Sequence, residues 1–198
     1  MNKKALLQKL NSIDILEIII RAFEKVPREE FVPEKYKPYA YEDIPLPIGH
    51  GATISQPWTI AFMLNLLELK KNQKVLEIGS GSGYVLALLS EITHGNIFGV
   101  EINTELAARS QKTLRKLGYT KIKIINKSGS HGLPEHAPFD CILISAAAQD
   151  APYHLTGQLK EKGIIVASVQ DKVVKITKTN NKLITQEFKG FSFVPLQD

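Results

Sequence analysis

Residues 74–84 read KVLEIGSGSGY, and this segment gives the strongest indication of the fold. Its first half is a short apolar run of the kind that forms a buried strand, and its last residue opens a helical pattern. Gly79, Gly81 and Gly83 separate the two. Because glycine has no Cβ, the backbone can turn tightly there and come close to a bound molecule. The stretch therefore predicts a strand, a ligand-facing loop and a helix in succession.

The alternation of strands and helices continues toward the C-terminus. Further strands are predicted over 96–101, 121–126, 139–147 and 163–169. Helices are predicted over 84–93, 104–118 and 154–163. Strands that are apolar on both faces and alternate with helices indicate an α/β fold with a parallel sheet covered by helices on both sides. Residues 172–188 form two alternating runs joined by two asparagines, which predicts an added antiparallel β-hairpin.

The segment before the glycine loop carries a helical pattern and then many prolines. Apolar residues recur every three or four positions over 4–25, and another helix is expected to begin at Pro57. We expect one domain over residues 1–198. Within it, 1–57 hold an N-terminal helix and a loop rich in glycine and proline, and 58–198 hold the ligand-binding core and the hairpin.

The charge of the chain bears on its partners. The chain has 198 residues and a formal net charge of +5. The excess lies in 101–198, which hold 14 basic and 9 acidic side chains. Lysines that alternate with apolar residues are typical of the solvent-facing side of a sheet, and here they are Lys172, Lys175, Lys178, Lys182 and Lys189. Arginine is scarce, so we expect no nucleic-acid partner.

The single cysteine, Cys141, lies in the apolar run FDCILIS and is expected to be a buried structural thiol. Because it cannot form an internal disulfide, a reducing compartment fits the chain. The N-terminal residues lack the apolar core of a signal peptide, and no apolar span reaches about 18 residues. We therefore expect a soluble, cytoplasmic protein without a membrane partner. The histidines lack the spacing of metal ligands, so we expect no metal site.

Two acidic residues accompany the glycine loop. Glu101 ends the next predicted strand, 22 residues after Gly79, where a carboxylate can accept hydrogen bonds from both hydroxyls of a ribose. Glu77 lies near the end of the first predicted strand, two residues before Gly79. The spacing G-x-G-x-G differs from the dinucleotide and phosphate-binding motifs, and no lysine or arginine follows the loop. These features favour a nucleoside with positive rather than negative charge, and S-adenosylmethionine fits.

With these residues in view, the chain resembles the protein-L-isoaspartate O-methyltransferases over nearly its whole length. The similarity is carried by AFEKVPREEFVP at 22–33, AYEDIPLPIGHGATISQP at 40–57, KVLEIGSGSGY at 74–84, LPEHAPFDCILISAAA at 133–148 and FVPL at 193–196. The run PIGHGATISQP is the most specific, since generic methyltransferases lack it.

The resemblance implies a Rossmann-like class I methyltransferase fold, with a mostly parallel sheet flanked by helices and a C-terminal antiparallel hairpin. It also implies a reaction. A methyl group passes from S-adenosylmethionine to the free carboxylate of L-isoaspartyl residues in damaged proteins, which opens a route of protein repair. The partners implied are proteins or peptides that contain such residues.

The resemblance implies site residues as well. Ser55 is the implied active-site serine, whose hydroxyl holds the acceptor carboxylate; alternatively, it caps the helix that begins near Pro57. The implied substrate-binding residues are His50, Ala52, Thr53, Ile54 and Val194. The implied cofactor-binding residues are Glu77, Gly79, Ser80, Gly81, Gly83, Glu101, Ser128 and Gly129.

Two segments depart from the family pattern. Residues 126–130 read NKSGS, with Ser128 where the family has an aspartate that accepts a hydrogen bond from the adenine amine. A neutral acceptor weakens cofactor binding by about 1–2 kcal/mol. Residues 166–171 read VASVQD where the family has a Pro-Val-Gly run beside the substrate. Two alternatives therefore stay open: a methyltransferase of this fold with a different acceptor, and a catalytically weak relative that binds proteins.

Overall fold

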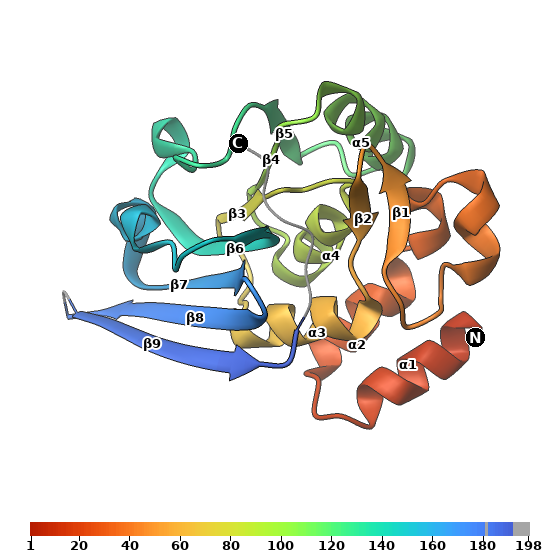
Figure 1. The fold of residues 1–198 in the computed structure, drawn as a ribbon, viewed down its shortest axis with the longest axis horizontal. Helices are drawn as coiled ribbons and strands as arrows, with labels where there is room; N and C mark the ends of the chain where they lie inside the picture. The colour runs from red at the N-terminus through yellow and green to blue at the C-terminus, as the bar shows by residue number, and fades with distance from the viewer. Residues whose placement is uncertain (181, 192–198) are drawn as a thin grey trace.

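The computed structural model describes residues 1–180 and 182–191. These residues form a seven-stranded sheet with the order β5-β4-β3-β6-β7-β8-β9 (Figure 1). Its strands are β3 (Val75–Ile78), β4 (Ile97–Glu101), β5 (Lys123–Asn126), β6 (Phe139–Ala148), β7 (Leu159–Val169), β8 (Lys172–Thr179) and β9 (Lys182–Lys189). The strands from β5 to β7 are parallel, and β8 and β9 are antiparallel. The predicted mostly parallel sheet with a C-terminal hairpin is confirmed.

The helices and a small second sheet surround this centre. The α-helices are α1 (Lys3–Asn11), α2 (Glu17–Lys25), α3 (Pro57–Leu66), α4 (Tyr84–Thr93) and α5 (Thr104–Lys116). The 3-10 helices are η1 (Arg28–Phe31), η2 (Glu34–Tyr39), η3 (Pro134–His136) and η4 (Tyr153–Gln158). A separate antiparallel hairpin, β1 (Leu46–Gly49) and β2 (Ala52–Ile54), stands beside α5 in Figure 1.

The two faces of the seven-stranded sheet are covered differently. Side chains from the α-helices pack with Val75 and Leu143 on one face. On the other face, Leu76 belongs to a cluster with Leu133 and Leu155, which lie at η3 and η4. Connections between parallel strands are right-handed, so the direction in which the chain crosses the sheet decides which face the connection covers. The chain moves from β3 through β4 to β5 toward one edge, and from β6 to β7 toward the other, so the two sets of connections cover opposite faces. The predicted flanking helices are therefore α-helices on one face and short 3-10 helices on the other.

The N-terminal helical pattern is divided into two helices, α1 and α2. The break follows α1, where the Ser12 hydroxyl donates to the carbonyl oxygen of Lys9 at 2.7 Å, and Asp14 takes a φ of +56°. Serine and aspartate compete with helical hydrogen bonding in this way. The backbone N–H of Leu16 then donates to Asn65 Oδ1 on α3 at 3.1 Å. The break thus attaches the N-terminal helices to α3.

The prediction of a helix over 154–163 is wrong. The 3-10 helix η4 ends at Gln158, and β7 begins at Leu159, which pairs with Phe139 of β6. Leu155 and Leu159 are four residues apart, which looks helical in the sequence, yet both are buried against the sheet. The register between β6 and β7 then shifts, so the residues before Gly163 form a bulge. Pairing with β6 overrides the local helical spacing.

The lysines of the C-terminal hairpin do not all face solvent as predicted. Lys175 is 8% exposed, and its Nζ bonds to Glu68 Oε1. Lys178 Nζ donates to the carbonyl oxygens of Thr156 and Leu159, at 3.2 and 3.1 Å. The prediction fails for these two lysines because Glu68, just after α3, binds one of them, and η4 and the start of β7 bind the other.

Cys141 is buried on β6, as predicted, with 1% of its surface exposed. Burial raises the pKa of its thiol to about 12, so the thiolate that reacts as a nucleophile is disfavoured. In the part of the chain that the structure describes, no helix is long and apolar enough to cross a membrane.

Candidate active site

The glycine loop lies at the carboxyl end of β3. Gly79 takes a φ of +77°, and a Cβ on this residue would lie 3.0 Å from the Cβ of Ala146 on β6. Glycine is needed there for both reasons, since other residues rarely adopt such a φ and a side chain has no space. Gly83 has a different use, because a Cβ on it would lie 3.1 Å from Leu114 of α5. Gly79 shapes the loop, and Gly83 lets α4 and α5 approach.

Glu101 lies at the carboxyl end of β4 and faces this loop. Its carboxylate accepts hydrogen bonds from the N–H of Gly81, at 2.7 Å on Oε2, and of Asn103, at 2.9 Å on Oε1. The residue is 6% exposed. A carboxylate oxygen can accept two hydrogen bonds, so each oxygen keeps the capacity for one ribose hydroxyl. The loop and the acid are thus joined by a hydrogen bond within the chain.

A cavity of about 290 Å³ opens at this edge of the sheet. It lies where the strand order reverses, since β3 pairs with β4 on one side and β6 on the other. Open α/β sheets bind ligands at such switch points. Among the described residues that line the cavity there is no lysine or arginine. The cavity brings together most of the predicted site residues: His50, Ala52, Thr53, Ser55, Gly79, Gly81, Glu101 and Gly129.

A second, smaller cavity of about 50 Å³ adjoins the first, and Ser55 and Gly79 line both. The predicted residues Ile54, Glu77 and Ser80 line only this smaller one. Within the described residues, Glu77 Oε2 and the Ser80 hydroxyl are buried and have no hydrogen-bond partner. Two unpartnered polar atoms at the base of the site leave hydrogen-bonding capacity for a bound molecule.

Glu77 is 1% exposed, and its Oε1 accepts a hydrogen bond from the Ser145 hydroxyl at 2.7 Å. Burial raises the pKa of Glu77 to about 8, the hydrogen bond from Ser145 opposes the rise, and the charge of Glu101 adds to it. A buried carboxyl group near a second carboxylate resists ionisation for these two reasons. A cation bound beside Glu77 would favour its ionised form.

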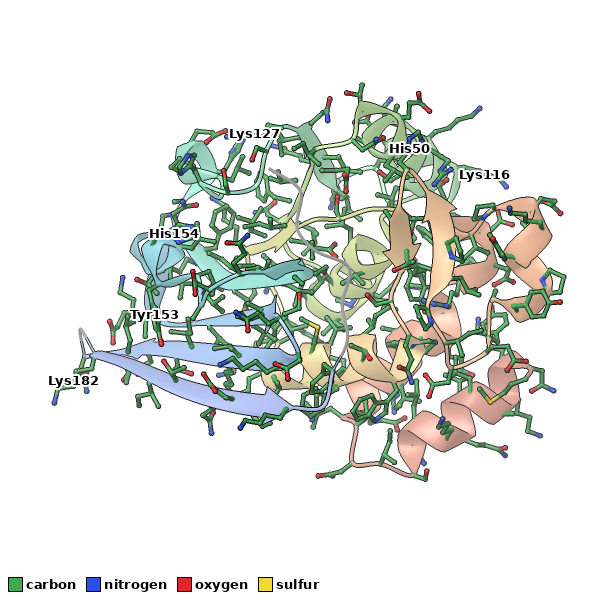
Figure 2. The ribbon with its side chains drawn as sticks, in the orientation of Figure 1. His50, Lys116, Lys127, Tyr153, His154 and Lys182 are labelled. Carbon is green, nitrogen blue, oxygen red and sulfur yellow. The ribbon has the colours of Figure 1, made fainter. Side chains whose placement is uncertain are left out.

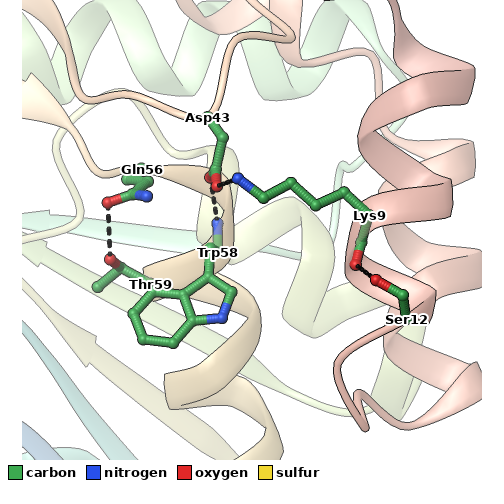
Figure 3. A network of polar contacts seen from close by, with 6 residues as sticks. All are labelled: Lys9, Ser12, Asp43, Gln56, Trp58 and Thr59. Carbon is green, nitrogen blue, oxygen red and sulfur yellow. Dashed lines mark hydrogen bonds and ion pairs between the residues drawn. The ribbon is translucent and has the colours of Figure 1, made fainter.

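Ser55 lies between the end of β2 and the start of α3. Its carbonyl oxygen accepts a hydrogen bond from Arg28 Nη2 at 2.9 Å. The N-terminus of α3 is capped by Asp43, whose Oδ1 accepts from the N–H of Trp58 at 2.9 Å (Figure 3). Gln56, directly before α3, makes no side-chain capping bond. Because Asp43 serves as the cap, the alternative that Ser55 only caps this helix is not supported.

The β1–β2 hairpin forms the outer wall of the cavity. Gly49, His50 and Gly51 at its tip all have positive φ, of +97°, +54° and +72°. His50 Nε2 lies 3.1 Å from Glu105 Oε2 on α5, and Figure 2 labels His50 on the side of the hairpin nearest that helix. Arg109, also on α5, donates from Nη2 to the carbonyl oxygen of Ile48. Contacts with α5 therefore fix the hairpin over the cavity.

Ser128 does not line the cavity. Its hydroxyl lies 3.0 Å from the hydroxyl of Ser130, and the N–H of Ser130 donates to it at 3.4 Å. Gly129 does line the cavity, and a Cβ there would lie 2.4 Å from Ile78 Cγ2. The predicted substrate-binding residue Val194 lies outside the described residues.

Several residues that shape the site were not predicted from the sequence. Arg28, Asp43 and Arg109 hold the wall of the cavity around Ser55 and the hairpin, and Ser145 donates to Glu77. Arg28 stands beside Glu29 and Glu30 in the run VPREEFVP, where nothing in the sequence marks it as buried. The contacts of the other three connect segments far apart in the sequence, which no local pattern shows.

The residues present fit an S-adenosyl nucleoside. Glu101 can bind a ribose, the glycine loop gives the backbone close access, and the unpartnered Glu77 Oε2 suits a cationic group nearby. The absence of lysine and arginine from the described lining disfavours a phosphate. Fold and site together define the Rossmann-like methyltransferases that use S-adenosylmethionine.

Comparison with known proteins names the family. The family model of protein-L-isoaspartate(D-aspartate) O-methyltransferase (PCMT) matches residues 1–198. A protein-L-isoaspartate O-methyltransferase from Ignicoccus hospitalis is 42% identical over 185 residues, which are 90% of this chain and 88% of that one. One from Methanocella arvoryzae is 42% identical over 178 residues, 87% of this chain and 95% of that one. The chain belongs to the protein-L-isoaspartate(D-aspartate) O-methyltransferase family.

Solved structures agree. A protein-L-isoaspartate O-methyltransferase has a TM-score of 0.92 and 26% identity, covering all of this chain and 66% of that longer one. The Plasmodium falciparum beta-aspartate methyltransferase PCMT, in complex with S-adenosyl-L-homocysteine, has a TM-score of 0.85 and 26% identity, covering 100% and 99% of the two chains. The chain therefore transfers a methyl group from S-adenosylmethionine to the carboxylate of L-isoaspartyl residues, a protein-repair reaction.

Proposed function

We propose that the large cavity holds both reactants of this methyl transfer, and that Ser55 orients the acceptor carboxylate. The observation that carries the proposal is that Ser55, Gly79 and Glu101 line one cavity. Glu101 and the glycine loop hold the nucleoside, and Glu77, with its unpaired oxygen, lines the adjoining smaller cavity. S-adenosylmethionine supplies an activated methyl group on a sulfonium sulfur. Every other task falls to the residues of the chain.

The chain's residues need to position the acceptor rather than to activate it. The free carboxyl group of an isoaspartyl residue, with a pKa near 4, is already ionised at neutral pH, so no general base is required. Alignment of two reactants can contribute about 7–11 kcal/mol to lowering the barrier. A hydroxyl at Ser55 can donate a hydrogen bond to one acceptor oxygen and leave the other free to attack the methyl carbon.

The backbone of the neighbouring segment suits a peptide. Ala52 and Thr53 line the cavity with short side chains, which leaves their N–H and C=O groups accessible to a peptide main chain. His50 stands at the entrance and is partly exposed. We assign these three residues to the acceptor peptide, and Ile54, whose side chain is buried, to support of the loop.

The acceptor partners proposed are proteins and peptides rather than nucleic acids, and the proposed location is the cytoplasm. Lys175 and Lys178 bind a carboxylate and two carbonyl oxygens of the chain itself, which reduces the basic surface available for a phosphate backbone. The buried Cys141 thiol is compatible with a reducing compartment.

The test is transfer of labelled methyl from S-adenosylmethionine to a short L-isoaspartyl peptide, with the same peptide carrying normal aspartate as control. Base-labile label on the isoaspartyl peptide alone is the expected result, because a carboxyl methyl ester hydrolyses in base. Label on both peptides, or only on a different acceptor, supports a methyltransferase with another acceptor. No label at millimolar donor, with donor binding intact, supports a protein-binding relative without turnover.

A further inference from the structure

Arg28 is a buried arginine to which the methyl transfer described above assigns no role. Its side chain is 0% exposed, on the 3-10 helix η1. Within the described residues its Nη1 has no hydrogen-bond partner, and Asp43, the carboxylate whose charge acts on the guanidinium, forms its ion pair with Lys9 instead. Burying a guanidinium without a paired carboxylate is costly. The contacts that it does make therefore show what the arginine holds in place.

Arg28 joins three segments through one guanidinium group. Its Nε donates to the carbonyl oxygen of Ala40 at 2.8 Å, and its Nη2 donates to the carbonyl oxygen of Ser55 at 2.9 Å. The guanidinium lies 5.1 Å from the centre of the Tyr84 ring, at the first residue of α4. The rigid planar fork of arginine fixes the angle between its hydrogen bonds, which a lysine cannot do.

Ser55 needs such support because neither neighbouring element holds it. The β1–β2 ladder ends with the pair Leu46 and Ile54, and α3 begins at Pro57. The two residues between, Ser55 and Gln56, form the link. Across this link, a small rotation of the backbone would move the Ser55 hydroxyl within the cavity. The bond from Arg28 to the Ser55 carbonyl oxygen opposes that rotation.

We propose that Arg28 is a positioning residue for methyl transfer, which fixes the backbone of Ser55 so that its hydroxyl meets the acceptor carboxylate. This inference rests on the role of Ser55 proposed above. Arg28 lines neither the large cavity nor the smaller one. Of its two hydrogen bonds, only the one to Ser55 reaches a residue that lines the large cavity, so we expect Arg28 to affect the acceptor step and to leave donor binding unchanged.

The test is a double-mutant cycle that combines Arg28→Lys with Ser55→Ala, measured as kcat, the KM for an isoaspartyl peptide and the donor Kd. Arg28→Lys alone is expected to lower kcat about 10- to 100-fold, as a misplacement of about 1 Å can do. In the Ser55→Ala background, the same change is expected to lower kcat less than about threefold, because residues that act as one unit are not additive. The donor Kd should stay within about threefold in all variants.

Phe31→Leu provides the matched control for packing. Phe31 lies on the same 3-10 helix, is buried, and contacts the same Tyr84 ring, with 5.4 Å between ring centres, but makes no bond to Ser55. It should lower the unfolding temperature while leaving kcat unchanged. If Arg28→Lys is unfolded at the assay temperature, Arg28→Gln, which keeps two N–H donors, replaces it in the cycle.

The possible outcomes separate the two proposals. If Ser55→Ala leaves kcat unchanged, the proposed role of Ser55 fails, and the inference fails with it. If Ser55→Ala lowers kcat but Arg28→Lys has the same effect in both backgrounds, the role of Ser55 stands and the inference for Arg28 is overturned. A donor Kd that weakens in parallel with kcat, or a kcat loss in Phe31→Leu equal to that in Arg28→Lys, also overturns it.

Discussion

The wall of the cavity that carries the glycine loop is held by the sheet, whereas the wall that carries Ser55 is held by side chains from distant segments. In the first, or donor wall, the N–H groups of Gly79 and Ser80 both donate to the carbonyl oxygen of Val100, at 2.9 and 3.1 Å. In the second, or acceptor wall, Arg28 reaches Ser55 across 27 residues, and Arg109 reaches the β1–β2 hairpin across 61 residues.

The two walls should respond differently to substitution. A backbone-built wall changes only if the backbone conformation changes, so substitutions at its glycines should have large effects on donor binding. A wall held by side chains depends on single contacts, each of modest energy. Removing one contact should therefore have a moderate effect, and the effect should fall on the acceptor peptide rather than on donor binding.

Gly79→Ala should weaken donor binding by about 100-fold or more, which corresponds to about 2.7 kcal/mol or more. The reason is that Gly79 has a φ of +77° and a Cβ there would lie 3.0 Å from the Cβ of Ala146, so the loop must move. Donor Kd by calorimetry measures the change. Gly118→Ala is the matched control, since Gly118 has a φ of +87° but no atom within 4 Å of the added Cβ. Equal weakening in both variants would contradict a donor wall shaped by Gly79.

Glu101→Gln should weaken donor binding by about tenfold. This lies near the lower end of the range of about 1.5–3 kcal/mol for hydrogen bonds to charged groups, because the amide keeps one acceptor oxygen. The peptide KM should not change. Donor titration at fixed peptide measures both. Glu17→Gln is the control, since the Glu17 side chain is 64% exposed and forms an ion pair with Arg21 on the protein surface. A larger effect on peptide KM than on donor Kd would show that Glu101 belongs to the acceptor wall.

Glu77→Gln should be more stable than the wild-type protein without ligand, by an amount that grows as pH rises. The pKa of Glu77 is raised from its ordinary value of 4.5 to about 8, mainly by burial. Between these values the unfolded chain binds fewer protons than the folded one, so wild-type stability falls with pH by up to about 1.4 kcal/mol per unit, and glutamine does not titrate. The advantage of the variant should therefore grow by up to about 2 kcal/mol from pH 6 to 7.5.

Urea unfolding of the two proteins at several pH values measures this difference. The exposed Glu24 provides the control, and Glu24→Gln should show no growing advantage. An advantage of Glu77→Gln that is constant with pH would show that Glu77 is ionised in the folded protein throughout this range. The donor wall would then hold two carboxylates rather than one carboxylate and one protonated acid.

Asp43→Asn should have the smallest effect and should act on the acceptor wall. Although burial opposes it, hydrogen bonds from Lys9, Trp58 and Gln56 hold the pKa of Asp43 below its usual value. Asparagine can still cap α3 but loses the ion pair with Lys9, which is 2.7 Å long. The unfolding free energy should fall by about 1 kcal/mol and the peptide KM should rise about threefold.

Chemical unfolding and peptide kinetics measure these two quantities for Asp43→Asn. Glu34→Gln serves as control, because Glu34 forms an ion pair with Lys37 and its side chain is 87% exposed. In the wild-type protein, the stability that ionised Asp43 contributes should be lost as pH falls through its lowered pKa, because the contribution requires the ionised carboxylate. A change in donor Kd, with the peptide KM unaffected, would break the separation of the two walls.

The sequence predicts the donor wall well because that wall is local. The strand that ends at Ile78, the glycines that follow and the acid at Glu101 all occur at strand ends, and parallel strands bring their ends to one edge. Gly83 shows the limit of such motif-based assignment. It belongs to the motif, yet the structure uses it for packing between α4 and α5, which the spacing alone does not reveal.

The acceptor wall could be located only through resemblance, and its supports not at all. Arg28, Asp43 and Arg109 act on residues that lie 27, 15 and 61 positions away, so no periodicity connects them. The failure at η4 has a similar cause. The spacing of Leu155 and Leu159 fits a helix, and only pairing with β6 decides that the second leucine begins a strand.

The most direct measurement is kcat of Ser55→Ala at saturating donor and isoaspartyl peptide, with the donor Kd measured on the same preparation. We predict that kcat falls at least about tenfold, because the acceptor carboxylate loses a hydrogen bond that aligns it. The donor Kd should stay within about twofold, because Gly79 and Glu101 are untouched. An unchanged kcat, or a donor Kd that weakens as much as kcat falls, would contradict a cavity with separate donor and acceptor walls.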